Sequence, residues 1–267
     1  MRSLKLRFRL ALMAVLIAAA HASQCPADTI TSVTYAGSES TVYQQQQENL
    51  AASATFVFDA DTHQLTVTLT NTSGFVTPDL AGTLTGLYFD TTHLLSPVSA
   101  AIAPGSSAVN GTITNVGDGW AYGTGLGTSA QGMNSEITAT GAVNNGNAPS
   151  QPNFSATPTQ NLDGGAYGIV SNGTVAFLDG LKNNGPQVED SIVFTLTAAS
   201  GFSLTELGGA VVFQFGTALS EPNFTGPPGN ITTFQSTPEP KEIVAGLGAL
   251  GAVLPILTLR RRRTQFV

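Results

Sequence analysis

Alternation of apolar and polar residues between positions 54 and 70 is the feature that most constrains the fold. The apolar positions are Ala54, Phe56, Phe58, Leu65, Val67 and Leu69, and the last three alternate with threonines. A turn at residues 60–63 separates the two runs. Because successive side chains on a strand point to opposite faces, each run predicts a strand with one face buried. The pair predicts an antiparallel hairpin.

Other short runs, separated by clusters of Asn and Gly, extend this pattern. Strands are expected at residues 82–90, 108–116, 174–178, 191–197 and 209–215. Gln44–Ala52 is expected to form a short helix. The Gly- and Asn-rich stretch 120–163 is expected to be long loops or a poorly ordered insertion. The sequence therefore predicts an all-β domain, built as an antiparallel β-sandwich or a jelly roll.

Basic residues are concentrated at the two ends of the chain. Eight of the ten Lys and Arg residues lie in the first nine positions or in the run Arg260, Arg261, Arg262 and Arg263. Between residues 23 and 240 one lysine, Lys182, is present with 16 acidic residues, which gives a formal charge of −15. Nucleic-acid binding depends on Lys and Arg that neutralise phosphates. We therefore expect no nucleic-acid partner.

The N-terminus has the three parts of a secretory signal. A basic region, Arg2–Arg9, precedes the apolar run Leu10–Ala20, and the small residues Ala20 and Ala22 then mark a cleavage site. The apolar run is much shorter than the roughly 20 residues that span a bilayer. We expect residues 1–22 to be removed, so that the mature chain begins at Ser23.

Cys25 is the single cysteine of the chain, so no intramolecular disulfide can form and stability must come from the core. A lipoprotein would instead be acylated at this cysteine and begin there. Gln24, however, lies where a lipoprotein signal has a small residue. Cleavage before Ser23 is therefore the expected outcome.

The C-terminus combines Pro238-Glu239-Pro240, an apolar stretch Ile243–Leu259 and the arginine run 260–263. At about 1.5 Å per residue the apolar stretch makes a helix of about 25 Å, slightly shorter than the ~30 Å bilayer core. Lys241 and Arg260 can reach the two interfaces. The arginines predict that the tail stays cytoplasmic while the domain faces outward.

This three-part tail resembles the PEP-CTERM sorting signal of Gram-negative bacteria. The resemblance implies recognition by exosortase, a membrane cysteine enzyme that cuts near the Pro-Glu-Pro motif. It covers about 30 residues, 238–267, and concerns sorting rather than activity. Three internal segments resemble a family of exosortase-dependent surface proteins, and this resemblance implies location only. They are Trp120-Ala121-Tyr122, Tyr167-Gly168-Ile169 and residues 213–222, FQFGTALSEP.

Candidate catalytic groups are few. The mature domain has two histidines, His63 in the predicted hairpin turn and His93 at a strand end. A Ser-His-Asp site would need one of them, and no Gly-x-Ser-x-Gly sequence is present to hold the serine. Zinc needs three or four His, Cys or carboxylate ligands. Gly123-x-Gly125-x-Gly127 lacks the helix and lysine of a nucleotide loop. The sequence predicts no catalytic residue and no metal site.

Two pairs of nearby acidic residues, Asp59/Asp61 and Glu189/Asp190, remain. Two carboxylates can hydrolyse a glycosidic bond, but these pairs are expected to be solvated surface groups. Asp59-x-Asp61-x-His63 departs from a calcium loop at its third ligand, and no glycine follows. We expect no cofactor; calcium is the ligand that an acidic, extracytoplasmic domain would favour.

The expected organisation is a signal peptide (1–22), an acidic β-rich domain (23–220), a Pro- and Gly-rich stalk (221–237) and the sorting tail (238–267). The leading hypothesis is a non-enzymatic surface or extracellular-matrix protein, exported by the Sec machinery and anchored briefly in the inner membrane. The family resemblance links it to exopolysaccharide and biofilm. The alternatives are a carbohydrate-binding module with Trp120 and Tyr122 in an aromatic platform, and, less favoured, a secreted hydrolase with converging carboxylates.

Overall fold

The computed structural model describes residues 28–43, 46–74, 80–124, 132–140, 153–155, 162, 165–172, 185–218 and 220–235. Within these residues the chain is all-β, with short 3₁₀ turns and no α-helix. The predicted signal peptide and sorting tail lie outside the described residues, as does the strand predicted at 174–178.

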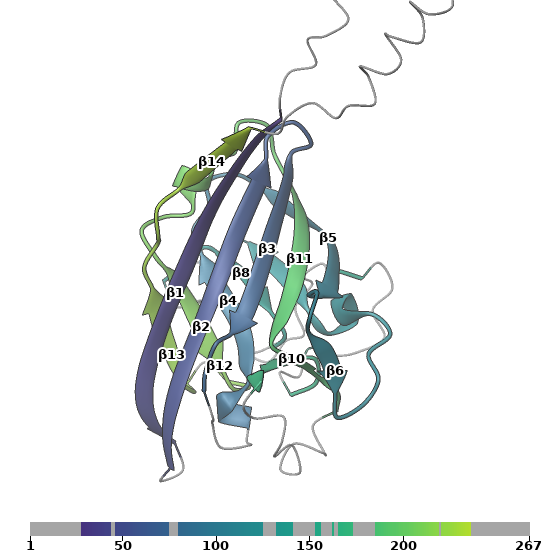
Figure 1. Cartoon of the computed structure of the whole chain (residues 1–267), viewed down its shortest axis with the longest axis vertical. Helices are drawn as coiled ribbons and strands as arrows, with labels where there is room; N and C mark the ends of the chain where they lie inside the picture. Colours follow the sequence, from purple (N-terminus) through teal and green to yellow (C-terminus); the bar gives the residue numbers. More distant parts are fainter. Residues whose placement is uncertain are drawn as a thin grey trace, which may run out of the picture. The chain divides into compact units, whose positions relative to one another are not determined.

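The strands form two sheets (Figure 1). In spatial order, the first sheet contains β14 (Thr232–Gln235), β1 (Thr29–Tyr43), β2 (Gln46–Asp59), β3 (Gln64–Asn71), β11 (Ser191–Ala198) and β5 (Leu95–Ile102). The second contains β13 (Asn223–Gly226), β12 (Val211–Phe215), β4 (Leu84–Phe89), β9 (Ile169–Val170), β10 (Gln187–Glu189) and β6 (Ser107–Val109). Two further strands, β7 (Ala121–Thr124) and β8 (Ser135–Thr138), join it through β4.

The predicted hairpin is confirmed as β2 and β3, joined by a turn at residues 60–63. Along β3 every second residue is buried, which places its threonines on the outer face of the sheet. The strands predicted at 82–90, 191–197 and 209–215 are also confirmed, as β4, β11 and β12. β3 and β11 alternate between buried and less buried residues, whereas every residue of β4 and β12 is buried, so these two are short apolar runs covered on both faces.

The two sheets face each other across one apolar core, in a sandwich-like arrangement. Phe56 of the first sheet meets Phe89 of the second edge to face, with ring centroids 5.5 Å apart. Phe194 of β11 contacts Trp120, which precedes β7, at 5.0 Å. These four side chains are fully buried. Aromatic pairs in such geometry add to the stabilisation that burial alone provides.

One pair of strands departs from the expected antiparallel pattern. β9 and β10 run parallel, with Val188 opposite Ile169. Sixteen residues separate the two strands in the sequence, enough for the crossover connection that a parallel pair needs. The second sheet is therefore mixed, whereas β1, β2, β3, β11 and β5 of the first sheet pair antiparallel.

The helix predicted at Gln44–Ala52 is wrong, because β2 begins at Gln46. Leu50 and Ala52 are buried and extend the alternation of Ala54 and Phe56 toward the N-terminus. Pairing with β1 runs along the whole of β2, from Tyr43 opposite Gln46 to Ile30 opposite Asp59. This long ladder overrides the local helix propensity of the glutamines.

The strand predicted at 108–116 is mostly wrong, since β6 ends at Val109. Asn110 and Gly111 both have positive φ, 60° and 150°, which a continuing strand cannot accommodate. The chain then forms a 3₁₀ turn, η2 (Val116–Gly119), capped by the Asn115 side chain. In the stretch 120–163, which was expected to be loops, the structure places β7 and β8.

The stalk predicted at 221–237 is wrong over most of its length. Asn223–Gly226 is β13 and pairs with β12, and Thr232–Gln235 is β14 beside β1. This segment passes from the edge of one sheet to the edge of the other. Gly37 on β1 permits its close approach, because a Cβ there would lie 2.8 Å from the Thr225 carbonyl oxygen. Proline and glycine content alone did not indicate these pairings.

The chain enters and leaves this domain at one end (Figure 1). Ile30, near the start of β1, pairs with Asp59 beside the β2–β3 turn. Near the start of β14, the Thr232 hydroxyl lies 3.5 Å from the Ser32 carbonyl oxygen, to which it donates a hydrogen bond. Both connections to the terminal segments therefore start next to the β2–β3 turn.

Within the described residues, no helix has the length and apolar character to cross a membrane. The predicted span Ile243–Leu259 lies outside them.

Truncating Phe194 tests the core. We expect Phe194→Ala to lower the free energy of unfolding by about 3–5 kcal/mol, because it removes a buried ring in contact with Trp120. Urea unfolding followed by the fluorescence of Trp120, the single tryptophan, measures this. Val193→Ala, the adjacent residue on the outer face, is the matched control and should cost much less. Equal losses in the two variants would contradict the assigned faces of β11.

Candidate functional site

His63 lies in the β2–β3 turn, exposed and with a positive φ of 54°. The turn is held by Asp59, whose Oδ1 accepts hydrogen bonds from the backbone N–H groups of Asp61 at 2.9 Å and Thr62 at 3.3 Å. The Thr62 side chain, also bonded to Asp59, contributes most to lowering the pKa of this carboxyl. Asp59 and His63 thus have a structural place in the turn.

The second acidic pair lies at the opposite end of the first sheet. Gln64 of β3 pairs with Asp59, and Thr70 of β3 pairs with Ser191, next to Asp190. Six residues of strand separate these two positions, which corresponds to about 20 Å. Carboxylates that act together on a glycosidic bond lie roughly 5–10 Å apart. The pairs Asp59/Asp61 and Glu189/Asp190 are therefore not brought together.

Glu189 and Asp190 instead bind nearby serines. The Ser107 hydroxyl donates to Glu189 Oε2 at 2.8 Å, and the Ser191 hydroxyl donates to Asp190 Oδ2 at 3.2 Å. Asp190 has a positive φ of 75°, at the corner where the chain leaves β10 in one sheet and enters β11 in the other. These contacts fit a role in holding the corner.

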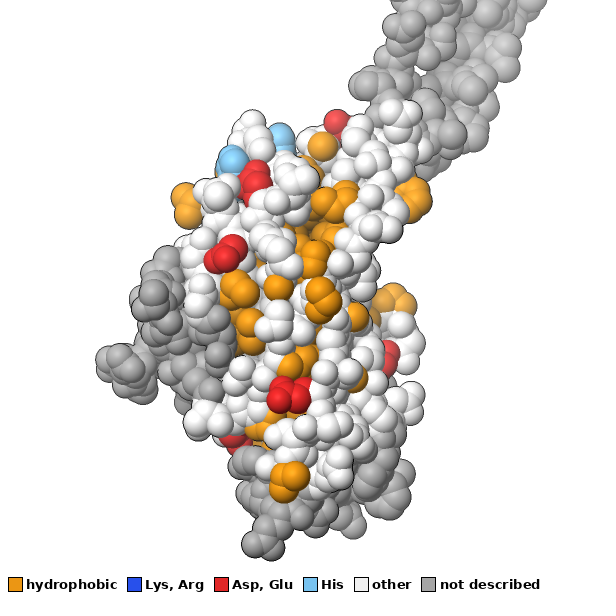
Figure 2. Space-filling view, turned by 90° about the vertical axis from the view of Figure 1, so that its left-hand side faces the viewer, with side chains coloured by type: hydrophobic (Ala, Val, Ile, Leu, Met, Phe, Trp, Pro, Cys, Tyr) orange, Lys and Arg blue, Asp and Glu red, His pale blue; other side chains and the backbone are white. Residues whose placement is uncertain are grey.

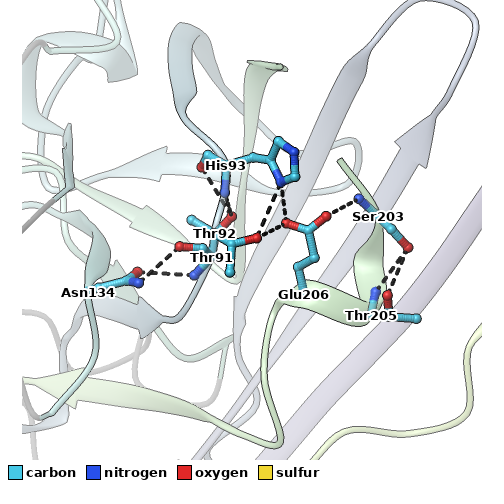
Figure 3. Close-up of polar contacts among 7 residues, drawn as sticks. All are labelled: Thr91, Thr92, His93, Asn134, Ser203, Thr205 and Glu206. Carbon is cyan, nitrogen blue, oxygen red and sulfur yellow. Dashed lines mark hydrogen bonds and ion pairs between the residues drawn. The ribbon is translucent and has the colours of Figure 1, made fainter. Parts of the chain in front are cut away.

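His93, for which the sequence predicts no catalytic role, has a carboxylate partner in the structure (Figure 3). Its Nδ1 lies 2.5 Å from Glu206 Oε2, and the Thr92 hydroxyl donates to the same oxygen at 2.5 Å. Glu206 lies in η6 (Leu204–Glu206), more than one hundred residues further along the chain. Its second oxygen, Oε1, accepts from the Ser203 N–H at 3.1 Å.

Burial and hydrogen bonding act in opposite directions on the pKa of Glu206. Burial alone would raise the pKa of this carboxyl, but hydrogen bonds from Thr92 and His93 outweigh that effect, so its pKa lies below the ordinary value. The fold therefore favours the ionised carboxylate, which is the form that pairs best with His93. Phe202 lies edge-on to the His93 ring, with centroids 6.5 Å apart.

A second group of polar contacts holds the loop that carries His93. The side chain of Asn134, just before β8, accepts from the Thr91 N–H at 3.0 Å and donates to the Thr91 carbonyl at 2.9 Å. The Asn134 N–H donates to Asp90 Oδ1 at 2.9 Å. The loop between β4 and β5 is thus fixed to β8 on one side and, through His93, to η6 on the other (Figure 3).

The His93–Glu206 pair has the histidine and carboxylate of a nucleophile-activating site, and within the described residues the hydroxyl hydrogen-bonded to the His93 ring is that of Thr92, 3.3 Å from Nδ1. No described hydroxyl is hydrogen-bonded to His93 Nε2, and Ser203 Oγ contacts Thr205 Oγ1 at 3.0 Å. The His93–Glu206 contact holds the β4–β5 loop against η6. The sequence contained one signal for Glu206: Ser203-x-x-Glu206 is a capping box, and both of its reciprocal bonds form.

The aromatic residues considered for a carbohydrate platform lie in the core. Trp120 is completely buried and Tyr122 is 2% exposed. The Trp120 indole N–H donates to the Tyr167 carbonyl at 2.8 Å. Gly119 lets Tyr167 approach, since a Cβ there would lie 2.5 Å from the tyrosine ring. Neither Trp120 nor Tyr122 presents a face to a ligand.

The third segment of the family resemblance, residues 213–222, forms a sharp corner. The Gln214 side-chain N–H₂ donates to the carbonyls of Phe215 at 2.6 Å and Ala218 at 3.1 Å. The Glu221 carboxylate accepts from the Thr217 N–H and from the Ala218 N–H. All three segments thus make internal structural contacts.

Glu136 on β8 is a buried acid that the sequence did not single out. It lies between Tyr88 of β4 and Gly123 of β7 and is fully buried. No described residue donates a hydrogen bond to either of its carboxyl oxygens. Burial raises its pKa to about 8, and burial followed by the Glu136 charge raises the pKa of Tyr88. Glu136 is therefore mostly protonated at neutral pH.

The described residues contain no group of three His, Cys, Asp or Glu side chains placed to hold a metal ion. The predicted sorting, orienting and cleavage residues lie outside the described residues: Pro238, Glu239, Pro240, Arg260, Arg261, Arg262, Arg263, Ala20, Ala22 and Ser23.

Comparisons with protein-family models, curated proteins and solved structures find no match to this chain.

Because folding raises the pKa of Glu136, the free energy of unfolding should depend on pH. Between its ordinary pKa of 4.5 and about 8, the folded chain keeps a proton that the unfolded chain loses. The free energy of unfolding should therefore fall as pH rises through this window, by about 1.4 kcal/mol for each unit of pKa difference. Glu136→Gln should remove most of this slope, as measured by urea unfolding near pH 5 and near pH 9. Glu39→Gln, at an exposed position of β1, should leave the slope in place; a slope unaltered by Glu136→Gln would refute this account.

The contribution of the His93–Glu206 contact to stability can be tested with His63 as the control. His93→Asn should lower the free energy of unfolding by about 1 kcal/mol or less, since the pair is partly exposed. This loss should shrink as pH falls through the lowered pKa of Glu206, where the carboxylate is protonated. His63→Asn is the control, because asparagine accepts a positive φ. Thermal unfolding of both variants at several pH values measures the effect, and equal losses in the two would contradict this contribution.

Proposed function

We propose that this chain is an exported surface or extracellular-matrix protein of a Gram-negative bacterium, processed by an exosortase and non-enzymatic. The observation that carries the proposal is the tail: Pro238-Glu239-Pro240, the apolar stretch Ile243–Leu259 and the arginines 260–263. Before processing, the apolar stretch serves as a single transmembrane helix, and the two packed sheets form a sandwich-like ectodomain. Exopolysaccharide or biofilm matrix is the proposed setting.

The described domain supports a structural role. Its one His–carboxylate pair is bound to neighbouring threonine and serine groups, and its two acidic pairs lie at opposite ends of β3. The alternative carbohydrate-binding module loses support because Trp120 and Tyr122 are in the core. A hydrolase built on the predicted acidic pairs loses support because about 20 Å separates them.

The placement of the chain ends also suits this function. Both connections leave the domain beside the β2–β3 turn, so a signal peptide and a membrane tail would join the same end. Pro238 follows Gln235, the last residue of β14, after two residues. Prolines at 238 and 240 restrict the chain to extended conformations and keep it from joining the following helix. A membrane enzyme would thus meet a strand-like substrate near the bilayer.

Replacing Pro238-Glu239-Pro240 by three alanines tests the proposal. We expect the unaltered protein to be recovered outside the inner membrane, beginning at Ser23 and lacking the helix and arginines. The altered protein should remain longer and membrane-bound, as should the unaltered protein in cells without exosortase. Mass spectrometry of both termini measures this.

Ser236→Ala with Thr237→Ala, immediately before the motif, is the control and should be processed normally. An unaltered protein at the cell surface with its tail intact would refute the proposal.

A further inference from the structure

Exposed apolar side chains concentrate at the two edges of the first sheet. The large hydrophobic residues with high exposure are Val42, Leu94, Val98, Ile231 and Phe234, at 44–71%. Leu94 and Val98 belong to β5 and its approach, and Ile231 and Phe234 to β14 and its approach. β5 and β14 are the first and last strands of this sheet. Val42 lies near the tip of the β1–β2 hairpin, outside the two edge strands β5 and β14.

The β5 edge offers backbone groups for pairing. Ala103 N–H donates to the Ser191 carbonyl, so residues 101 and 99 also bond toward β11 by the alternation of an antiparallel ladder. Ala100 and Ile102 therefore turn their N–H and C=O groups away from β11, and no described residue bonds to them there. Pro97 and the irregular register near Val98 limit this open stretch to about four residues.

The β14 edge is similar in length and character. β14 has four residues, all exposed, and pairs with β1 on one side only. Figure 2 shows the side of the domain that carries β14, β1 and β13: hydrophobic side chains follow it in a broken line, and acidic side chains are scattered. An open strand edge of this kind is a template for another strand.

Charge restricts what can approach this domain. The described residues contain no Lys or Arg, and the span 23–240 has a formal charge of −15. Two copies would repel each other over most of their surfaces. Residues 91–117, which include β5, and residues 222–235, which include β14, contain no acidic residue. The two open edges are thus the places where like-charge repulsion between copies is weakest.

We propose that these edges bind a second copy of this chain, with β14 of one copy pairing with β5 of the next. The open stretches match in length, each is flanked by exposed apolar side chains, and neither carries charge. Because the two edges differ, the contact is heterologous and repeats into an open chain of domains rather than a closed dimer. This inference goes beyond the proposed function and holds whether or not the tail is removed.

The test uses the full-length protein in detergent micelles, with sedimentation velocity reporting the assembly size. We expect assemblies that grow with protein concentration and with added salt, since salt screens the repulsion between acidic copies. Val98→Glu blocks the β5 edge and Phe234→Glu blocks the β14 edge, so each variant alone should be monomeric. Val42→Glu is the matched control, at an exposed apolar residue outside β5 and β14, and should assemble as the unaltered protein does.

Mixing the two edge variants gives the sharpest outcome. Val98→Glu keeps its β14 edge and Phe234→Glu keeps its β5 edge, so a mixture should form one-to-one dimers and nothing larger. Trp120 fluorescence must show that each variant is folded. A monomeric unaltered protein, loss of assembly in Val42→Glu, or dimers of Phe234→Glu by itself would overturn the proposal; the last result would indicate symmetric pairing of β5 with β5.

Discussion

Phe56, Phe89, Trp120 and Phe194 meet between the two sheets, and the rest of the domain depends on that packing. The chain has one cysteine, so it cannot form an internal disulfide. The described residues have no Lys or Arg, and His93 and Glu206 form a partly exposed ion pair among them. Neither cross-links nor ion-pair networks can therefore replace the core. Burial of apolar side chains is the main stabilising contribution.

Polar side chains act mainly at the places where the chain changes direction or sheet. Asp59 holds the β2–β3 turn, Asp190 the corner from β10 to β11, and Glu221 the corner after β12. His93 and Glu206 connect the β4–β5 loop to η6. These carboxylates are bound to backbone N–H groups, hydroxyls and a histidine. Acidic residues therefore serve the architecture here even though, as a set, they give the domain a large negative charge.

The candidate sites differ in how far the local sequence determines them. His63 was expected in the hairpin turn, and it lies there, exposed. The His93–Glu206 contact joins residues 113 positions apart, and no local pattern records such a separation. Glu136 alternates with Ile137 as an ordinary outward-facing residue would, yet it is completely buried. Burial of an outer face depends on what packs over it, which periodicity within one strand cannot reveal.

By itself the sequence determined the all-β class, the strands whose alternation marks a face against the core, and the large negative charge of the domain. It also supplied the targeting pattern at both ends, on which the proposed export and processing rest. Only the tertiary structure decided that 46–52 is strand, that 223–235 crosses between sheets, and that Trp120 is core. The physical reason is the range of the interactions. Alternation and turn chemistry act within a few residues, whereas strand partners, ion pairs and burial depend on segments that meet only after the chain has folded.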